Sequence, residues 1–379
     1  MSEEIKNLQE ELNDQMQIRR DKLAEYEADG IYPFGQRFVV KDHAKDIKND
    51  FLNYEDQPVV IAGRLMTMRS HGKTAFANIR DLSGDIQVYF RKDVLGEDNY
   101  KYVKMLDIGD IVGIEGHVFK THSGEVTIKV DKLTLLSKAL RPLPEKWHGL
   151  KDTELRYRQR YVDLIVNPEV RDTFVKRSKI VAKIREYMMN DGFMEVETPM
   201  MHPIPGGAAA RPFITHHNAL DIDIYMRIAP ELYLKRLIVG GMERVFEMNR
   251  CFRNEGIDNR HNPEFTTIES YQAYGDVEDA IRLTENLVSY CAQEVLGTQE
   301  ITYQGTEINL TPPWNRITMA EGVKKYTGED FDAVTTVEEA RAIADRLNVE
   351  YTNNDGIGKI LNACFEDYVE ENLIQPTIV

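Results

Sequence analysis

Residues 252–265 gather charged and aromatic side chains that could bind a ligand carrying a phosphate, a flat base and a positive charge. The stretch reads F-R-N-E-G-I-D-N-R-H-N-P-E-F. Arg253 is a permanent cation whose planar guanidinium matches phosphate and carboxylate groups. Glu255 can accept hydrogen bonds, and Phe265 offers a ring on which a base can stack. These residue types indicate a binding site rather than a packing surface.

Two extended segments flank this stretch and would present it as the loop of a hairpin. Residues 244–253 lead into the loop, and residues 263–273 lead out of it. Side chains alternate between the two faces of an extended segment, so every second residue shares a face. If the matching faces of the two arms coincide, they form one floor that contains Arg253, Glu255, Phe265, Glu269 and Tyr271.

Composition limits the class of protein. The chain has 379 residues, enough for about two or three domains. Its formal net charge of −16 argues against general attraction to nucleic acid or anionic membrane, so nucleic-acid binding would have to be local. The three cysteines lie far apart and form no C-x-x-C pair, which indicates neither a disulfide framework nor a zinc site. Without a hydrophobic leader or a long apolar run, we expect a cytoplasmic protein with no membrane association.

Residues 1–140 predict a helical extension followed by a small β-barrel. Residues 1–55 form the extension, which begins with an amphipathic helix. Residues 56–140 alternate with period two, and a helix is expected at 92–106. Five strands with a helix between the third and the fourth are the order of an OB barrel. The expected strands lie near 58–69, 73–80, 84–91, 110–120 and 124–137.

Phe76 stands among polar neighbours on one face of the predicted second strand, where a core aromatic would be out of place. On the third strand Gln87 belongs to a second polar face beside the first, and Arg69 lies on the first strand. A ring, an amide and a cation on a sheet are what a single-stranded nucleic-acid platform needs. A barrel that binds another ligand, or none, is the alternative.

Residues 141–167 read as a linker that opens on a stiff R-P-L-P sequence, and residues 168–379 read as a further domain. A helix is expected from Pro168 to Gly192. A small-residue loop, I-P-G-G-A-A-A-R-P-F, follows at 204–213 and would let a ligand approach the backbone. Helices are also expected from Asp276 to Gly297 and near 337–347 and 357–372.

Several of these strings together resemble the class II aminoacyl-tRNA synthetases, most closely the bacterial members that charge lysine. F-R-N-E with His261-x-x-x-Phe265 is similar to the family's motif 2, and residues 192–199 are similar to motif 1, whose Pro199 equivalent lies at the homodimer interface. R-I-A-P-E-L-Y-L-K-R-L (227–237) and D-T-E-L-R-Y-R-Q-R-Y (152–161) also match the lysine enzymes. An OB domain before these motifs is similar to the subclass that charges lysine, aspartate and asparagine.

The resemblance implies a multidomain α+β fold, with an N-terminal helix and five-stranded OB barrel before an incomplete class II catalytic domain built on an antiparallel sheet. It also implies ATP-dependent amino-acid activation, in which the protein positions reactants and neutralises charge. Arg253 would then bridge the substrate carboxylate and the α-phosphate of ATP. Its alternative role is a structural salt bridge with Glu255 or Glu247.

Further roles follow from the same resemblance. Phe265 would stack under adenine, Glu255 would hold the adenine edge, and His261 with Asn262 would reach toward the triphosphate. In the OB domain, Phe76 and Gln87 match positions that read the central uridine of the anticodon of lysine tRNA. Arg69 matches a neighbouring contact.

The negative charge of the predicted amino-acid pocket favours L-lysine as the substrate. Its two ammonium groups each need an acceptor once they leave water. By the resemblance, Glu231 would take the α-ammonium, Glu269 and Tyr271 would line the side-chain pocket, and Gly207 would give a backbone contact. An aspartate or asparagine enzyme is the alternative. An aspartate enzyme would need a cation, and residues 263–276 contain no lysine or arginine.

The family's motif 3 and its Mg²⁺ ligands have no counterpart before residue 379, so we expect them beyond it and predict no metal site in this chain. We therefore expect a fragment or a truncated form that does not aminoacylate alone. Two other functions stay open. One is a non-catalytic tRNA-binding or regulatory protein, and the other is a synthetase-like paralogue that passes an amino acid to a protein.

Overall fold

The computed structural model describes residues 3–144, 150, 152–258 and 261–379. The chain divides into two compact units, Met1–Val170 and Arg171–Val379. Each unit has its own core, and each is described by itself. The finer division of the sequence into four segments stays a prediction.

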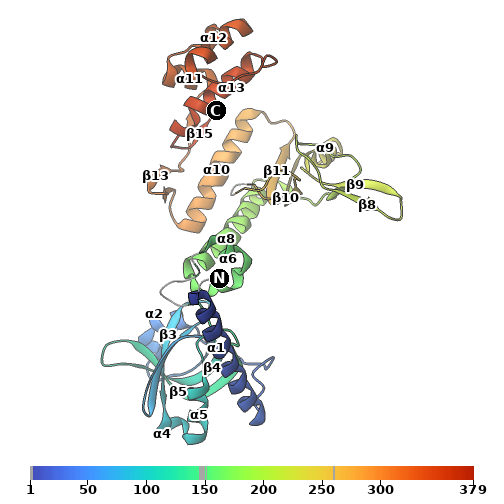
Figure 1. The fold of residues 1–379 in the computed structure, drawn as a ribbon. Helices are drawn as coiled ribbons and strands as arrows, with labels where there is room; N and C mark the ends of the chain where they lie inside the picture. Colours follow the sequence, from blue (N-terminus) through green and yellow to red (C-terminus); the bar gives the residue numbers. More distant parts are fainter. Residues whose placement is uncertain (1–2, 145–149, 151, 259–260) are drawn as a thin grey trace. The chain divides into compact units, whose positions relative to one another are not determined.

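The N-terminal unit is a closed five-stranded barrel with the strand order β1-β2-β3-β5-β4 (Figure 1). All five predicted strands are confirmed, and the helical stretch between the third and the fourth is confirmed as two short helices. The strands are β1 (Pro58–His71), β2 (Thr74–Arg80), β3 (Asp85–Arg91), β4 (Ile111–Lys120) and β5 (Val126–Ser137). The helices are α1 (Glu3–Ala28), α2 (Ala44–Asn49), α3 (Phe51–Tyr54), α4 (Lys92–Leu95), α5 (Glu97–Met105), α6 (Thr153–Arg158) and α7 (Arg160–Val166).

Strict alternation along β2 and β3 builds the barrel. Ala75, Ala77 and Ile79 of β2 point into the core, and the residues between them stay half-exposed. Glycine is needed where strands cross closely. A Cβ on Gly63 would lie 2.4 Å from the carbonyl oxygen of Arg80, so no larger residue fits there. The sequence pattern therefore sets both the inward face and the points of closest approach.

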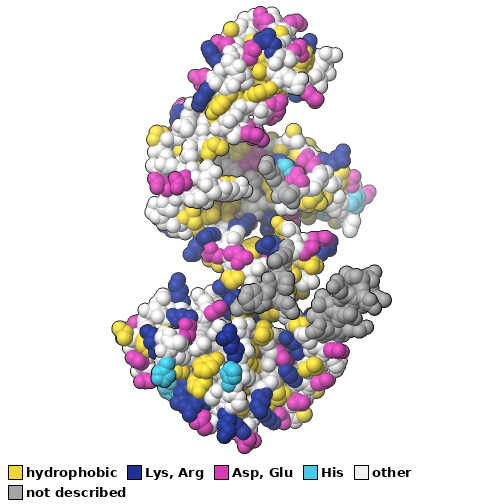
Figure 2. Space-filling view, turned by 60° about the vertical axis from the view of Figure 1, so that its left-hand side comes forward, with side chains coloured by type: hydrophobic (Ala, Val, Ile, Leu, Met, Phe, Trp, Pro, Cys, Tyr) yellow, Lys and Arg dark blue, Asp and Glu magenta, His cyan; other side chains and the backbone are white. Residues whose placement is uncertain are grey.

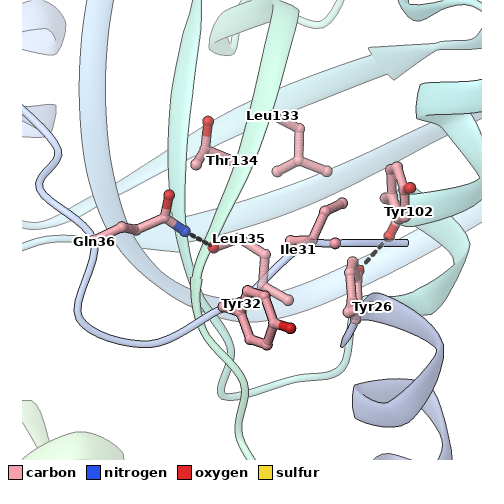
Figure 3. A pocket seen from close by; sticks show the side chains of 9 residues that line it. Tyr26, Ile31, Tyr32, Gln36, Tyr102, Leu133, Thr134 and Leu135 are labelled. Carbon is pink, nitrogen blue, oxygen red and sulfur yellow. Dashed lines mark hydrogen bonds between the residues drawn. The ribbon is translucent and has the colours of Figure 1, made fainter. Parts of the chain in front are cut away.

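Helix α1 runs along the barrel and is attached to it by polar contacts. The guanidinium of Arg19, nearly buried, donates to the carbonyl oxygens of Ile108, Ala139 and Arg141. Beyond the end of α1 lies a pocket of about 300 Å³, shown in Figure 3. Along its walls, Tyr26 donates to the carbonyl oxygen of Tyr102.

The C-terminal unit is organised around the hairpin that the sequence predicted. β10 (Arg244–Phe252) and β11 (Glu264–Gln272) pair antiparallel, and β6 (Met194–Glu195) adds a short parallel edge to β10. One face of this sheet packs on α8 (Pro168–Asn190) and α10 (Val277–Leu296) through a core that includes Met188, Phe193 and Phe246. The opposite face is left for α9 (Glu231–Val239), which contacts both strands of the hairpin.

The rest of this unit contains a smaller sheet, with the order β7-β9-β8, and a helical cluster. The expected helices near 337–347 and 357–372 are present, and the strand expected near the last residues pairs parallel with β14. The pattern missed α11 and the hairpin of β12 and β13. These elements are β7 (Met201–His202), β8 (Ile214–His217), β9 (Ile222–Met226), β12 (Glu300–Tyr303), β13 (Thr306–Asn309), β14 (Asn315–Arg316), α11 (Met319–Thr327), η1 (Phe331–Ala333), α12 (Val337–Leu347), α13 (Ile357–Tyr368), η2 (Glu370–Asn372) and β15 (Thr377–Ile378).

Among the described residues, no helix has both the length and the apolar character that a membrane span requires.

Candidate functional site

The register of the hairpin places the matching faces of its two arms together. Cys251 lies opposite Phe265, Glu247 lies opposite Glu269, and Val245 lies opposite Tyr271. Phe246 points the other way, into the core under the helices. The odd-numbered side chains of both strands therefore form one floor, as the alternation predicted.

Arg253 follows β10 at the end of this floor. Its backbone N–H donates to the carbonyl oxygen of Pro263 at 2.9 Å, and its guanidinium carbon lies 5.1 Å from the centre of the Phe265 ring. Nε of Arg253 is buried, and no described atom accepts a hydrogen bond from it. An unpaired buried donor costs free energy, so this nitrogen is suited to an incoming anion.

The structural salt bridge considered for Arg253 is absent among the described residues, because both acidic candidates have other partners. Glu247 pairs with Arg227, with Nη1 and Oε1 2.6 Å apart. Glu255 accepts a hydrogen bond from the backbone N–H of Arg211 at 3.2 Å. Asn254 also donates to the carbonyl oxygen of Arg211, at 2.7 Å, so the small-residue loop is held against the start of the hairpin loop.

The ion pair of Arg227 and Glu247 is fully buried, and sequence reasoning missed it. Nε of Arg227 donates to the carbonyl oxygen of Arg250 at 2.8 Å, and the hydroxyl of Thr198 donates to Glu247 at 2.6 Å. The pair therefore connects the segment after β6 with β10 on the face of the sheet that forms the floor. The available signal was an arginine between the apolar Met226 and Ile228, where a buried partner is required.

Glu231 begins α9, and Gly207 lies directly against it. Gly207 has a φ of +89°, which favours glycine, and an added Cβ would lie 2.9 Å from Cβ of Glu231. It would also lie 3.1 Å from Cβ of Ala229. The structure thus brings together two residues that are 24 positions apart in sequence (231 minus 207), on the side of the sheet where the floor lies.

Lys235 is a second cation that sequence reasoning overlooked. Its Nζ lies 2.5 Å from Oε1 of Glu231 and 6.0 Å from the centre of the Tyr271 ring. The Glu231 carboxylate is therefore already paired with an ammonium group. Lys235 lies outside residues 263–276, the range in which a cation was expected for an aspartate enzyme. Helix α9 brings it to the hairpin from elsewhere in the sequence.

Glu269 and Tyr271 form the acceptor end of the floor. The hydroxyl of Tyr271 donates to Oε2 of Glu269 at 3.2 Å. Burial raises the pKa of the Glu269 carboxyl, and the neighbouring Glu231 and Glu247 raise it further against the opposing effects of Tyr271 and Arg227. Burial likewise raises the pKa of the Tyr271 phenol. Because this site disfavours the negative charge of Glu269, a bound cation lowers the free energy of the charged carboxylate.

His261, Asn262 and Pro199 do not join the floor in this structure. The His261 ring is exposed, and its Nδ1 lies 2.7 Å from Oδ2 of Asp258. Asn262 is also exposed, and residues 259–260 of the same loop lie outside the described residues. Pro199 is exposed too, and its carbonyl oxygen lies 2.8 Å from Nε2 of His202.

The barrel brings the three predicted nucleic-acid residues to one pocket of about 680 Å³. Arg69 lies opposite Phe76 in the strand register, and Phe76 lies opposite Tyr89. The Phe76 and Tyr89 rings stack with centres 4.4 Å apart. Figure 2 shows a hydrophobic patch on the N-terminal unit with a histidine on either side and Lys and Arg side chains around it. Rings beside cations suit unstacked bases and their phosphates.

Hydrogen-bonding side chains form a second row across the same sheet. Thr67 lies opposite Asn78, which lies opposite Gln87, which in turn lies opposite Thr127. Gln87 therefore stands beside the aromatic row, where an amide can reach the edge of a stacked base. The geometry is that of a platform with a stacking row and a reading row.

Comparisons with known proteins agree with this arrangement. Residues 152–361 match the family described as tRNA synthetases class II (D, K and N), and residues 59–136 match the OB-fold nucleic acid binding domain. A lysine–tRNA ligase from Thermoanaerobacter pseudethanolicus is 57% identical over 379 residues, which is 100% of this chain and 76% of the relative. A lysine–tRNA ligase from Bacillus subtilis is 54% identical over 386 aligned positions, which cover 100% of this chain and 77% of that relative. The chain therefore belongs to the class II aminoacyl-tRNA synthetases, within the lysine–tRNA ligase family.

Proposed function

We propose that this chain binds L-lysine and ATP on the hairpin floor and provides this site to a lysine–tRNA ligase, which forms lysyl-adenylate and passes lysine to its tRNA. The observation that carries this proposal is the buried, unpaired Nε of Arg253 at one end of a floor whose other end is acidic. The first feature suits the anionic centre of the reaction, and the second suits a cationic side chain. The names of the relatives support lysine over aspartate or asparagine.

Activation needs the lysine carboxylate to attack the α-phosphorus of ATP in line and to displace pyrophosphate. This step requires no nucleophile or base from the protein, so the residues act by orientation and charge neutralisation. Arg253 bridges the carboxylate and the α-phosphate through its guanidinium, which always carries a positive charge. Phe265 stacks under adenine, and Glu255 accepts from the adenine amino group. His261 and Asn262 turn toward the triphosphate when ATP binds.

The lysine substrate lies between α9 and β11. Glu231 accepts from the α-ammonium, with the backbone of Gly207 beside it, and Glu269 with Tyr271 receives the ε-ammonium. The raised pKa of Glu269 supports this assignment, because an incoming ammonium relieves the cost of its buried charge. Lys235 must exchange its contact with Glu231 for solvent when lysine binds, at low cost because its side chain is more than half exposed.

The anticodon of lysine tRNA binds to the barrel in this proposal. Phe76 stacks on the central uridine, Gln87 reads its edge, and Arg69 holds a neighbouring phosphate. The stacked pair of Phe76 and Tyr89 and the pocket beside it support this role. These local features also allow an acidic chain to bind RNA. Since tRNA charging serves translation, we place the protein in the cytoplasm.

A homodimer through the motif 1 segment is a further part of the proposal. Large apolar side chains are exposed on α8 and in the segment after it, around the exposed Pro199. A second copy that covered them would remove these apolar side chains from water. The exposed side chains include Val175, Ile180, Met194, Met200 and Met201.

The family resemblance also implies Mg²⁺ with ATP. In the described part of the chain, no group of three or more His, Cys, Asp or Glu side chains is arranged to hold a metal ion. We therefore assign no Mg²⁺ ligand to these residues, and no step of the proposal depends on one.

Lysine binding by Glu269→Gln tests the proposed function, with Glu264→Gln as the matched control. Glu264 is on the same strand but is exposed on the opposite face, beside Arg250. Losing a buried charge partner costs about 2–5 kcal/mol, which weakens lysine binding at least about 30-fold. Equilibrium dialysis with labelled L-lysine measures the two affinities. Equal affinities for the two variants would reject Glu269 as the lysine acceptor.

A further inference from the structure

The amide of Gln87 is held from behind by Thr127, a fully buried hydroxyl residue of β5. The two residues lie opposite each other where β3 and β5 pair parallel. Oγ1 of Thr127 is 2.8 Å from Oε1 of Gln87 and 3.2 Å from the carbonyl oxygen of Glu125. A threonine hydroxyl has a single proton, and the closer oxygen is the better acceptor, so it donates to Gln87.

This contact decides which end of the amide faces the pocket. With Oε1 occupied by Thr127, the Nε2 group of Gln87 keeps its two donors for a ligand, and no described residue accepts a hydrogen bond from it. Uracil and guanine carry a carbonyl oxygen at the position where cytosine and adenine carry an amino group. A fixed donor therefore favours the carbonyl-bearing bases, and it repels the amino-bearing ones.

We propose that Thr127 is a positioning residue that sets the base preference of the barrel by fixing the orientation of the Gln87 amide. The proposal rests on the anticodon role of Gln87 proposed above and adds the source of its selectivity. The ligand class is an unpaired base with a carbonyl oxygen on its pairing edge, stacked on Phe76. Without the hydroxyl, the amide can turn over and can present Oε1 to an amino group instead.

The test uses the full 379-residue chain and two anticodon hairpin RNAs that differ only in a central uridine or cytidine. Filter binding gives the affinity ratio of the two RNAs for each variant. Thr127→Val keeps the volume and the β-branching but removes the hydroxyl. Since one neutral hydrogen bond is at stake, we expect the preference for uridine to fall by about fivefold. Thr127→Ser restores the hydroxyl and should restore the preference.

Matched variants separate a positioning role from a structural one. Thr134→Val makes the same chemical change on β5 at the pocket of Figure 3, away from Gln87, and should leave the ratio unchanged. Thr127→Ala is a second variant without the hydroxyl, in case the valine does not fold. Thr127→Val and Thr127→Ala both lack the hydroxyl. If either of them folds and keeps the wild-type affinity ratio of the two RNAs, the proposal is overturned.

Gln87→Ala distinguishes failure of this inference from failure of the proposed function. If Gln87→Ala keeps the full preference for uridine, then Gln87 does not read the base, and both the anticodon role and the inference drawn from it fall. If Gln87→Ala loses the preference while Thr127→Val keeps it, only the inference about Thr127 is overturned. Loss of the preference in both variants, with rescue by Thr127→Ser, supports both.

Discussion

Glu247→Gln is the perturbation that probes most directly how the floor is held in place. The substitution preserves shape but leaves the Arg227 guanidinium buried without a counter-charge. The two side chains are 0% and 1% exposed, so solvent does not screen the loss. Breaking a buried ion pair by removing one partner costs about 3–5 kcal/mol. Because glutamine can still accept one hydrogen bond from Nη1 of Arg227, we expect the lower end, about 3 kcal/mol.

Hydrogen exchange followed by mass spectrometry locates this loss. A decrease of about 3 kcal/mol in opening free energy accelerates exchange about 150-fold in the affected strands. Peptides that cover β10 should show this acceleration, and peptides that cover β1 of the barrel should not change. Glu264→Gln is the control, because its exposed pair with Arg250 at 3.4 Å contributes at most about 1 kcal/mol. Equal exchange of β10 in the two variants would refute the view that the buried pair supports the floor.

Three further predictions concern the proposed ligands and partner. Since burial raises the pKa of Glu269, the folded chain binds more protons than the unfolded chain between the ordinary and the raised value. The free energy of unfolding therefore falls as pH rises through that window. Glu269→Gln should raise the melting temperature at neutral pH while it weakens lysine binding. An unchanged melting temperature would contradict this cost of the Glu269 charge. Phe265→Ala should weaken ATP binding about tenfold by calorimetry through loss of stacking, and an unaltered affinity would remove Phe265 from the adenine site. Met194→Asp should shift the chain toward monomer in sedimentation, whereas a wild-type profile would exclude this segment from the interface.

Much of the fold follows from local patterns. Strands β2 and β3 alternate strictly between buried and half-exposed residues, so their faces could be predicted from the sequence. Asp276 at the start of α10 and Gly297 at its end are equally local signals, and the structure has them as its caps. The register of the hairpin follows from the same alternation, because a slip by one residue would turn Phe246 toward the pocket and Glu247 toward the core.

The missed elements differ in kind. Thr318 and Glu321 form a capping box at the start of α11, so this helix had a readable signal that was overlooked. The pairing of Arg227 with Glu247 had none of comparable strength, because it joins separate segments and depends on how they pack. Lys235 likewise becomes part of the pocket only because α9 lies across the hairpin. Local propensity determines which segments become helices and strands, whereas the charge balance of a site depends on contacts between segments that are distant in sequence.

The most direct test of the account compares the binding of L-lysine and L-norleucine to the 379-residue chain by calorimetry. The two amino acids share their backbone and chain length, but norleucine ends in a methyl group and lacks the ε-ammonium. If Glu269 and Tyr271 form a lysine pocket, norleucine should bind at least about 30-fold more weakly, because it leaves the partly buried Glu269 carboxylate without a counter-charge. Equal affinity for the two amino acids would contradict the account.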